Sequence, residues 1–127
     1  MPTSEFRGRS RAGDYGDFVS QVDETVGRVR RLLEERKLAK ETLLIVTSDN
    51  GAHWTPGDIE KWDHRANGLR RGQKADLWEG GHRVPFLVRW PGRVKAGTTS
   101  DALAGLNDVF ATVADLLKVR LPADAGE

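Results

Sequence analysis

The sequence of 127 residues contains no cysteine. A disulfide framework, a zinc–thiolate site and a cysteine nucleophile are therefore excluded for this chain. No apolar run reaches the roughly 18 residues that a membrane-spanning helix needs, and the N-terminus lacks the apolar core of a secretory signal. Neither sign of charge dominates, because 20 Lys and Arg stand against 19 Asp and Glu and give a net charge of +1. This balance provides no global attraction to nucleic acid or to a membrane surface.

The length and the hydrophobic content of 38% suffice for one small domain with a modest core. Residues 1–13 are polar and rich in arginine, and we expect a loop or a flexible terminus there. Capping candidates at residues 14–17 then precede an amphipathic helix of about five to six turns. Its apolar face recurs at spacings of three and four residues and comprises Val19, Val22, Val26, Val29 and Leu33. A second helix is predicted over residues 107–118.

Two apolar segments, residues 42–47 and residues 84–90, are predicted to be strands. The first is a continuous run without alternation, which is typical of a strand that is covered on both faces, as in a parallel sheet. The order helix, strand, long loop, strand, helix predicts an α/β fold in which helices flank a mixed or parallel sheet. Because both helices need a broader sheet than two strands, the sequence looks like a piece of an α/β domain.

Asp49 and Asn50 directly follow the first predicted strand. A carboxylate and an amide carbonyl are hard oxygen ligands that suit Ca²⁺ or Mg²⁺. Gly51 permits a turn that would direct both side chains into one site. The alternative is that these three residues are simply a favoured turn sequence. Two ligands are also too few, since Ca²⁺ takes about six to eight.

The connection between the two predicted strands is longer than a simple linking loop needs to be, and long ordered loops in compact domains usually have a function. Lys74 lies within it and offers a point charge for an anionic group, although a lone lysine is otherwise a surface residue. The basic cluster at residues 64–71 has no interleaved aromatic residues and does not indicate nucleic-acid binding. His53 and His64 lack the spacing of a zinc site. The sequence therefore predicts an anion- or metal-binding loop at a sheet edge.

Four stretches in this region resemble the second half of the catalytic domain of the sulfatase family, and most of all its arylsulfatase A-like branch. The resemblance extends over nearly the whole chain from Phe6, and it implies that residues 1–127 are part of an alkaline-phosphatase-like domain. The four stretches occur in the family's order, and this makes the match specific: they are residues 48–51, 67–74, 79–86 and 89–92.

The resemblance implies a hydrolase that acts on sulfuric esters. In such an enzyme Asp49 and Asn50 would be two of the Ca²⁺ ligands, with Mg²⁺ as the other candidate ion. Lys74 would bind the sulfate and help to neutralise the leaving oxygen, and His64 would lie near the mouth of the substrate site. A divalent ion and a lysine stabilise charge where it develops when a sulfate ester is cleaved.

One departure from the family pattern is severe. Family members use a formylglycine nucleophile, made from Cys or Ser in a Cys/Ser-x-Pro-x-Arg motif, and this motif is absent here. We therefore expect a fragment that is inactive alone and whose partner is the N-terminal half of the same enzyme. Family members are commonly periplasmic, secreted or lysosomal. Two other readings stay open, namely a non-catalytic remnant and a piece of a related phosphonate or phosphodiester hydrolase.

Overall fold

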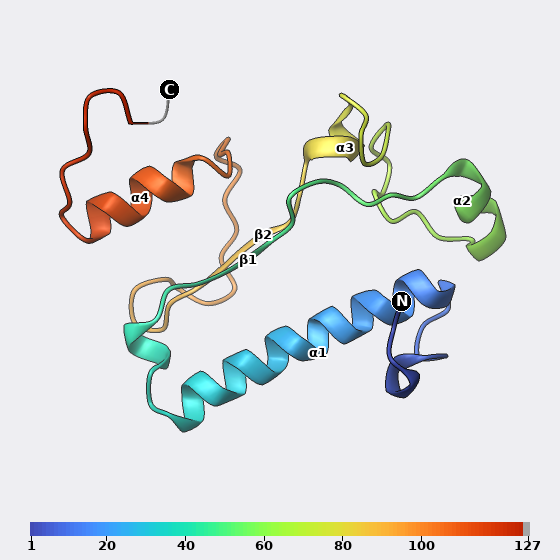
Figure 1. Cartoon of the computed structure of the whole chain (residues 1–127), viewed down its shortest axis with the longest axis horizontal. Coiled ribbons are helices and arrows are strands. Elements are labelled where there is room, and N and C mark those ends of the chain that lie inside the picture. Colours follow the sequence, from blue (N-terminus) through green and yellow to red (C-terminus); the bar gives the residue numbers. More distant parts are fainter. Residues whose placement is uncertain (126–127) are drawn as a thin grey trace. The chain divides into compact units, whose positions relative to one another are not determined.

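The computed structural model describes residues 1–125. The chain divides into two compact units, Met1–Ala96 and Gly97–Glu127. The first unit holds most of the regular structure (Figure 1). Its elements in chain order are the 3-10 helix η1 (Ser4–Phe6), α1 (Gly13–Glu35), the 3-10 helix η2 (Ala39–Glu41), β1 (Leu44–Thr47), α2 (Pro56–Trp62), α3 (Glu79–His82) and β2 (Phe86–Arg89).

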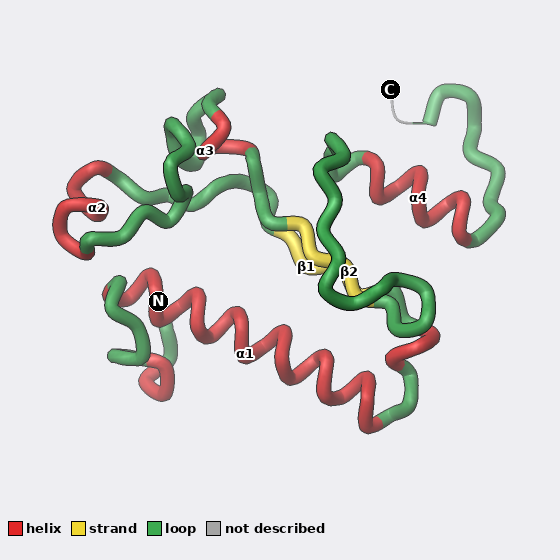
Figure 2. Tube along the Cα trace, turned by 180° about the vertical axis from the view of Figure 1, so that it is seen from behind, coloured by secondary structure: helices red, strands yellow, loops and turns green. Residues whose placement is uncertain are grey.

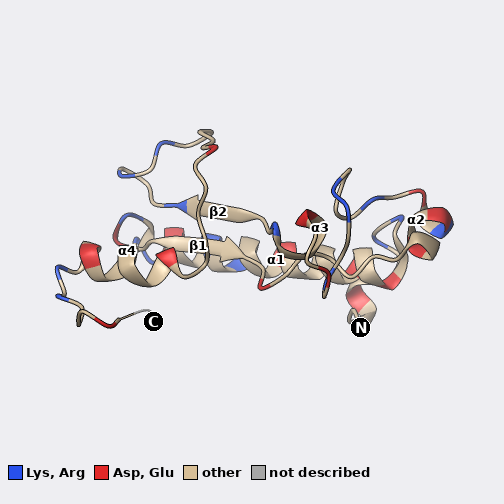
Figure 3. Cartoon of the chain, turned by 90° about the horizontal axis from the view of Figure 1, so that it is seen from above, with Lys and Arg blue, Asp and Glu red and all other residues tan. Residues whose placement is uncertain are grey.

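Helix α1 confirms the predicted amphipathic helix and has 23 residues. It begins at Gly13, earlier than the predicted start, and the backbone leaves it at Lys37, which has a positive φ of 59°. Charges of both signs lie along it (Figure 3). Glu24 accepts hydrogen bonds from Arg28 at 3.3 Å and from Arg31 at 2.7 Å. These exposed pairs follow the helical spacing and support the helix only weakly.

The segment before α1 is attached to the first turns of that helix. The Asp17 carboxylate accepts hydrogen bonds from the backbone N–H groups of Gly8 and Ser10, both at 2.7 Å. These two bonds hold the pKa of Asp17 below its usual value. The Phe6 side chain, only 4% exposed, is buried in the same region. A carboxylate on the helix thus fixes the path of the preceding loop.

Strands β1 and β2 lie where the sequence predicted strands, and they pair antiparallel (Figure 2). Leu44 stands opposite Arg89, and Thr47 stands opposite Phe86. The described residues form this two-stranded sheet, whereas a mixed or parallel sheet is not shown within them. The apolar run predicted a strand correctly, but such a run carries no information on the direction of the neighbouring strand. The side chain of Leu87 in β2 is 60% exposed.

Two contacts connect β2 and the residue after it with the C-terminal end of α1 and with η2. The Arg89 guanidinium is 2.8 Å from the Glu34 carboxylate. The indole N–H of Trp90 donates a hydrogen bond of 2.8 Å to the backbone carbonyl of Lys40. Arg89 is the last residue of β2 and Trp90 follows it, so the end of β2 is fixed to the segment that leads from α1 into β1.

The loop between the strands contains two short helices that the sequence analysis did not predict. Helix α2 begins with a capping box, in which Thr55 and Asp58 bond each other's backbone N–H groups, and Pro56 occupies its first position. In the second unit, α4 (Asp108–Leu116) lies within the predicted helix at residues 107–118. None of the helices within residues 1–125 is long and apolar enough to cross a membrane.

Candidate active-site loop

Asp49 and Asn50 follow β1, separated from it by Ser48, and so lie beyond the end of the strand as predicted. The Asp49 side chain is exposed and Asn50 is half-buried. The Ser48 hydroxyl donates to the backbone carbonyl of Asn50 at 2.8 Å. The Asn50 amide nitrogen donates a long bond of 3.4 Å to the Gly51 carbonyl. The amide oxygen of Asn50 and the carboxylate of Asp49 make no hydrogen bond within residues 1–125, and both are available as ligands.

The backbone after Asn50 crosses the end of the long loop at a point where only glycine fits. The N–H of Gly51 donates to the Gly81 carbonyl at 2.8 Å, and the N–H of Gly80 donates to the Arg71 carbonyl at 2.7 Å. A Cβ on Gly51 would overlap the carbonyl oxygen of Gly80, and a Cβ on Gly80 would overlap that of Gly72. The chain segments are therefore held at backbone-to-backbone distance.

Asn67 joins three parts of this loop with one side chain. Its Oδ1 accepts a hydrogen bond from the N–H of Ala52 at 3.0 Å. Its Nδ2 donates to the carbonyl of Ala52 at 3.0 Å and to the carbonyl of Gly72 at 3.3 Å. We call this set of bonds the Asn67 bridge. It ties the segment that follows Asp49 and Asn50 to the segment that precedes Lys74.

The structure brings the backbone of Lys74 to the end of β1. The N–H of Lys74 donates to the carbonyl of Ala52 at 3.1 Å, two residues after Asn50. The neighbouring Gln73 accepts a hydrogen bond from the N–H of Trp54 through its side-chain oxygen at 2.8 Å. The Lys74 side chain is exposed and forms no ion pair in the part of the chain that the structure describes. Its ammonium group is thus available for an external anion.

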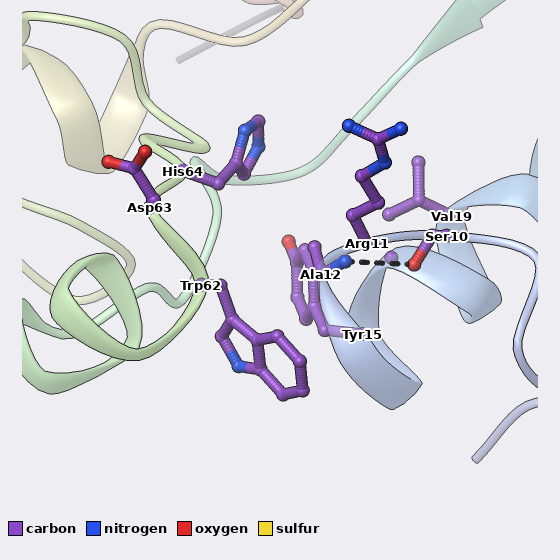
Figure 4. Close-up of a pocket in the computed structure, with 9 residues that line it drawn as sticks. Ser10, Arg11, Ala12, Tyr15, Val19, Trp62, Asp63 and His64 are labelled. Atoms are coloured by element: carbon purple, nitrogen blue, oxygen red, sulfur yellow. Dashed lines mark hydrogen bonds between the residues drawn. The ribbon is translucent and has the colours of Figure 1, made fainter.

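His64 follows α2 and is linked to the Lys74 segment through Trp54. The Trp54 side chain is only 5% exposed, and its indole N–H donates to the carbonyl of His64 at 2.8 Å. The His64 ring stands edge-on to Trp54 with 5.8 Å between ring centres. The ring of Tyr15 in α1 packs against the same indole, with 5.0 Å between the ring centres. His64 and Tyr15 line a cavity of about 570 Å³ (Figure 4).

The described part of the chain does not show a metal site, and the assignment of Asp49 and Asn50 as ligands stays a prediction. Within residues 1–125 no group of three or more His, Asp or Glu side chains is placed to hold a metal ion. Asp49 and Asn50 therefore have the donor chemistry of a hard-cation site but not the number of ligands that such a site needs.

Three residues that position this loop were not recognised from the sequence: Trp54, Asn67 and Gln73. Asn67 and Gln73 lie inside the stretch at residues 67–74 that carries the family resemblance. Their side chains bond backbone groups 15 and 19 residues away. Loop polarity alone contains no signal for such long-range bonds. Trp54 could have been suspected, because a tryptophan within a polar loop usually anchors it.

The family model described as "Sulfatase" matches residues 2–119. The chain therefore belongs to the sulfatase family, whose members hydrolyse sulfuric esters and typically use Ca²⁺.

Several known proteins are similar to this chain. It is 42% identical over 123 residues to the steryl-sulfatase of Homo sapiens, and the alignment covers 96% of this chain and 21% of that protein. It is 40% identical over 130 residues to the N-acetylgalactosamine-6-O-sulfatase of Bacteroides thetaiotaomicron, and that alignment covers 98% of this chain and 25% of the relative. The fold is similar to that of the PsFucS1 sulfatase from Pseudoalteromonas sp., with a TM-score of 0.82, 34% identity and coverage of 95% and 24%. The chain thus spans about a fifth to a quarter of the length of these relatives.

Proposed function

We propose that this chain supplies one side of the active site of a sulfatase, with Asp49 and Asn50 as two Ca²⁺ ligands and Lys74 as the catalytic, sulfate-binding lysine. The observation that carries the proposal is the hydrogen bond from the Lys74 N–H to the Ala52 carbonyl, at 3.1 Å. It joins residues that are 22 positions apart in the sequence, as counted from 52 to 74. The two kinds of group that the reaction needs therefore stem from adjoining backbone segments.

The cation would be held by the Asp49 carboxylate and the Asn50 amide oxygen, with Mg²⁺ as the alternative ion. These two donors would be part of a set of about six to eight oxygens. When bound, a divalent ion stabilises negative charge on the oxygens of the sulfate group. The other ligands, and the formylglycine nucleophile, would come from the N-terminal half of the same enzyme, and we expect no turnover by this chain alone.

The role of Lys74 follows from its charge and its exposure. Cleavage of a sulfate ester builds negative charge on the leaving oxygen, and a fixed ammonium group stabilises that charge. The Asn67 bridge would keep the ammonium on the same side of the loop as Asp49. His64 would contact the substrate farther from the sulfate. The same arrangement fits a mixed sheet in the whole enzyme, in which β1 has β2 on one side and a parallel strand on the other.

Titration of the 127-residue chain with Ca²⁺ tests the metal part of the proposal. We expect weak binding, with a Kd of roughly 1 mM, because the ligand set is incomplete. The exchange Asp49→Asn removes the only carboxylate of the pair and should abolish this binding. The matched exchange Asp23→Asn changes an exposed aspartate on α1 and should leave it unaltered. Equal binding by the two variants would refute the assignment of Asp49.

Binding of phenyl sulfate tests the lysine. Lys74→Gln should weaken it, whereas Lys40→Gln, which removes another exposed lysine, should not. Phenyl phosphonate serves as the competing ligand. Stronger Lys74-dependent binding of the phosphonate would favour the related phosphonate or phosphodiester hydrolase, and no Lys74-dependent binding of either would favour a non-catalytic remnant.

A further inference from the structure

The cavity beside the Lys74 loop has the size and the lining of a binding site. It lies between the start of α1, with the residues just before it, and the end of α2, with the residues just after it, and its volume is about 570 Å³. Small-molecule sites in proteins typically enclose roughly 300–1,000 Å³. Figure 4 shows side chains from both segments facing one another across it. Its lining includes Arg11, Tyr15, Trp62, Asp63 and His64.

Two features show that the aromatic walls are held in place before any ligand binds. The buried Trp54 contacts the ring of Tyr15 on α1 and the ring of His64 after α2, and its N–H fixes the His64 backbone. Gly13 lies so close to Trp62 that a Cβ there would overlap the indole ring. A wall that is already ordered loses little conformational entropy on binding.

The polar groups of the cavity favour a hydrophilic ring over a purely apolar one. The Tyr15 hydroxyl, the Trp62 indole N–H and the His64 ring nitrogens make no hydrogen bond within residues 1–125. Aromatic rings with a polar end bind ligands that are apolar on one face and hydrogen-bonding at the edge, as a sugar ring is.

The charges favour a ring that carries an anionic group. Arg11 lines the cavity and has no ion-pair partner in the described part of the chain. The Asp63 carboxylate, the only acidic group of the lining, points away from Tyr15 and Trp62 (Figure 4). A guanidinium binds carboxylate and sulfate groups through paired N–H donors.

We propose that this cavity is a subsite for an acidic sugar ring, with Tyr15 and Trp62 against the ring and Arg11 on its carboxylate or sulfate. This inference rests on the proposed function where it makes the ring part of the sulfate ester, and it names a sulfated acidic glycan as the substrate class. Trp54 connects the two places, because its backbone N–H donates to the side chain of Gln73 beside Lys74, while its indole N–H donates to the carbonyl of His64 at the cavity.

The test uses the 127-residue chain and the unsulfated disaccharide of chondroitin, which carries a carboxylate and no sulfate. Binding is followed by NMR through the side-chain N–H signals of the four tryptophans. We expect the Trp62 signal to shift most, and Arg11→Gln to weaken binding about three- to tenfold. Arg30→Gln removes an exposed arginine of α1 and is the matched control, with no expected change.

The choice of probe separates this proposal from the proposed function. Because the disaccharide carries no sulfate, it should bind the cavity even if the sulfatase assignment is wrong, and the titration with phenyl sulfate tests that assignment independently. The proposal is overturned if the disaccharide does not shift the Trp62 signal, if Arg11→Gln and Arg30→Gln bind it equally, or if phenyl sulfate occupies the cavity more tightly than the disaccharide does.

Discussion

The Asn67 bridge leads to a prediction that can be measured without any turnover. The exchange Asn67→Ala removes all three bonds of one amide group to the backbone of Ala52 and Gly72. Each bond of this kind contributes about 0.5–1.5 kcal/mol net. Asn67 is half-buried, and one of the three bonds is long, so we take the lower part of this range and expect a total near 2 kcal/mol.

The measurement is amide hydrogen exchange of the 127-residue chain, which reports local opening. A loss of about 2 kcal/mol corresponds to an exchange rate that is about 30-fold higher. The affected amides should be those of Ala52, which bonds Asn67 directly, and Lys74, which bonds the Ala52 carbonyl. Amides in the middle of α1 serve as the internal reference and should not change.

The control is Asn107→Ala, which alters an asparagine of the second unit whose side chain makes no cap hydrogen bond. Unchanged exchange of the Ala52 and Lys74 amides in Asn67→Ala would show that the Asn67 bridge does not hold these two segments together. An equal increase for all amides of the first unit would also contradict the prediction, because the bridge would then support the whole unit and not the link between the β1 end and Lys74.

Three further predictions concern other contacts of the first unit. Gly51→Ala should cost about 1–3 kcal/mol or more, because its Cβ overlaps the Gly80 carbonyl, and it should speed tryptic cleavage of the loop, whereas Gly57→Ala meets only an ordinary contact at 3.7 Å and should not. The folded pKa of Asp17 is lowered, so its bonds to Gly8 and Ser10 should persist above its ordinary value of 3.8 and be lost as pH falls through the lowered pKa. NMR titration of these two amides checks this, and Asp17→Asn should remove the pH dependence. With 4-nitrophenyl sulfate and Ca²⁺ the chain should show no turnover, and turnover above the buffer blank would contradict the missing nucleophile.

Periodicity and local chemistry predicted the elements that carry the site. Apolar residues at helical spacing predicted α1, because positions three to four residues apart lie on the same face of a helix. The helix is long, so this periodic signal accumulates over many residues. The strand before Asp49 was predicted because β-branched and apolar residues form an unbroken run. The Asp-Asn-Gly sequence then predicted two oxygen donors after that strand; Asp49 and Asn50 do follow β1, and their role as metal ligands stays a prediction.

The remaining features depend on contacts between distant residues. The direction of β2 relative to β1 depends on the path of a loop of 38 residues, counted from 48 to 85, and no local pattern encodes it. Helix α2 is too short for periodicity to show, although the Thr55 and Asp58 pair and Pro56 form a recognisable helix start. The Asn67 bridge is invisible in the sequence, because an amide in a polar loop has many possible partners.

The apolar faces of the first unit lead to a last prediction, on association. The most deeply buried apolar side chains of Met1–Ala96 are Phe6 and Trp54, while Phe18, Val22 and Leu32 of α1 are between 45% and 50% exposed. A monomer rarely leaves so much contiguous apolar surface uncovered. We therefore expect the 127-residue chain to associate, and Val22→Lys, which charges the middle of this face, to reduce the association relative to the solvent-face exchange Arg30→Gln. Light scattering after size exclusion measures both effects, and a monomeric wild-type chain that binds no hydrophobic dye would show that these faces need no cover.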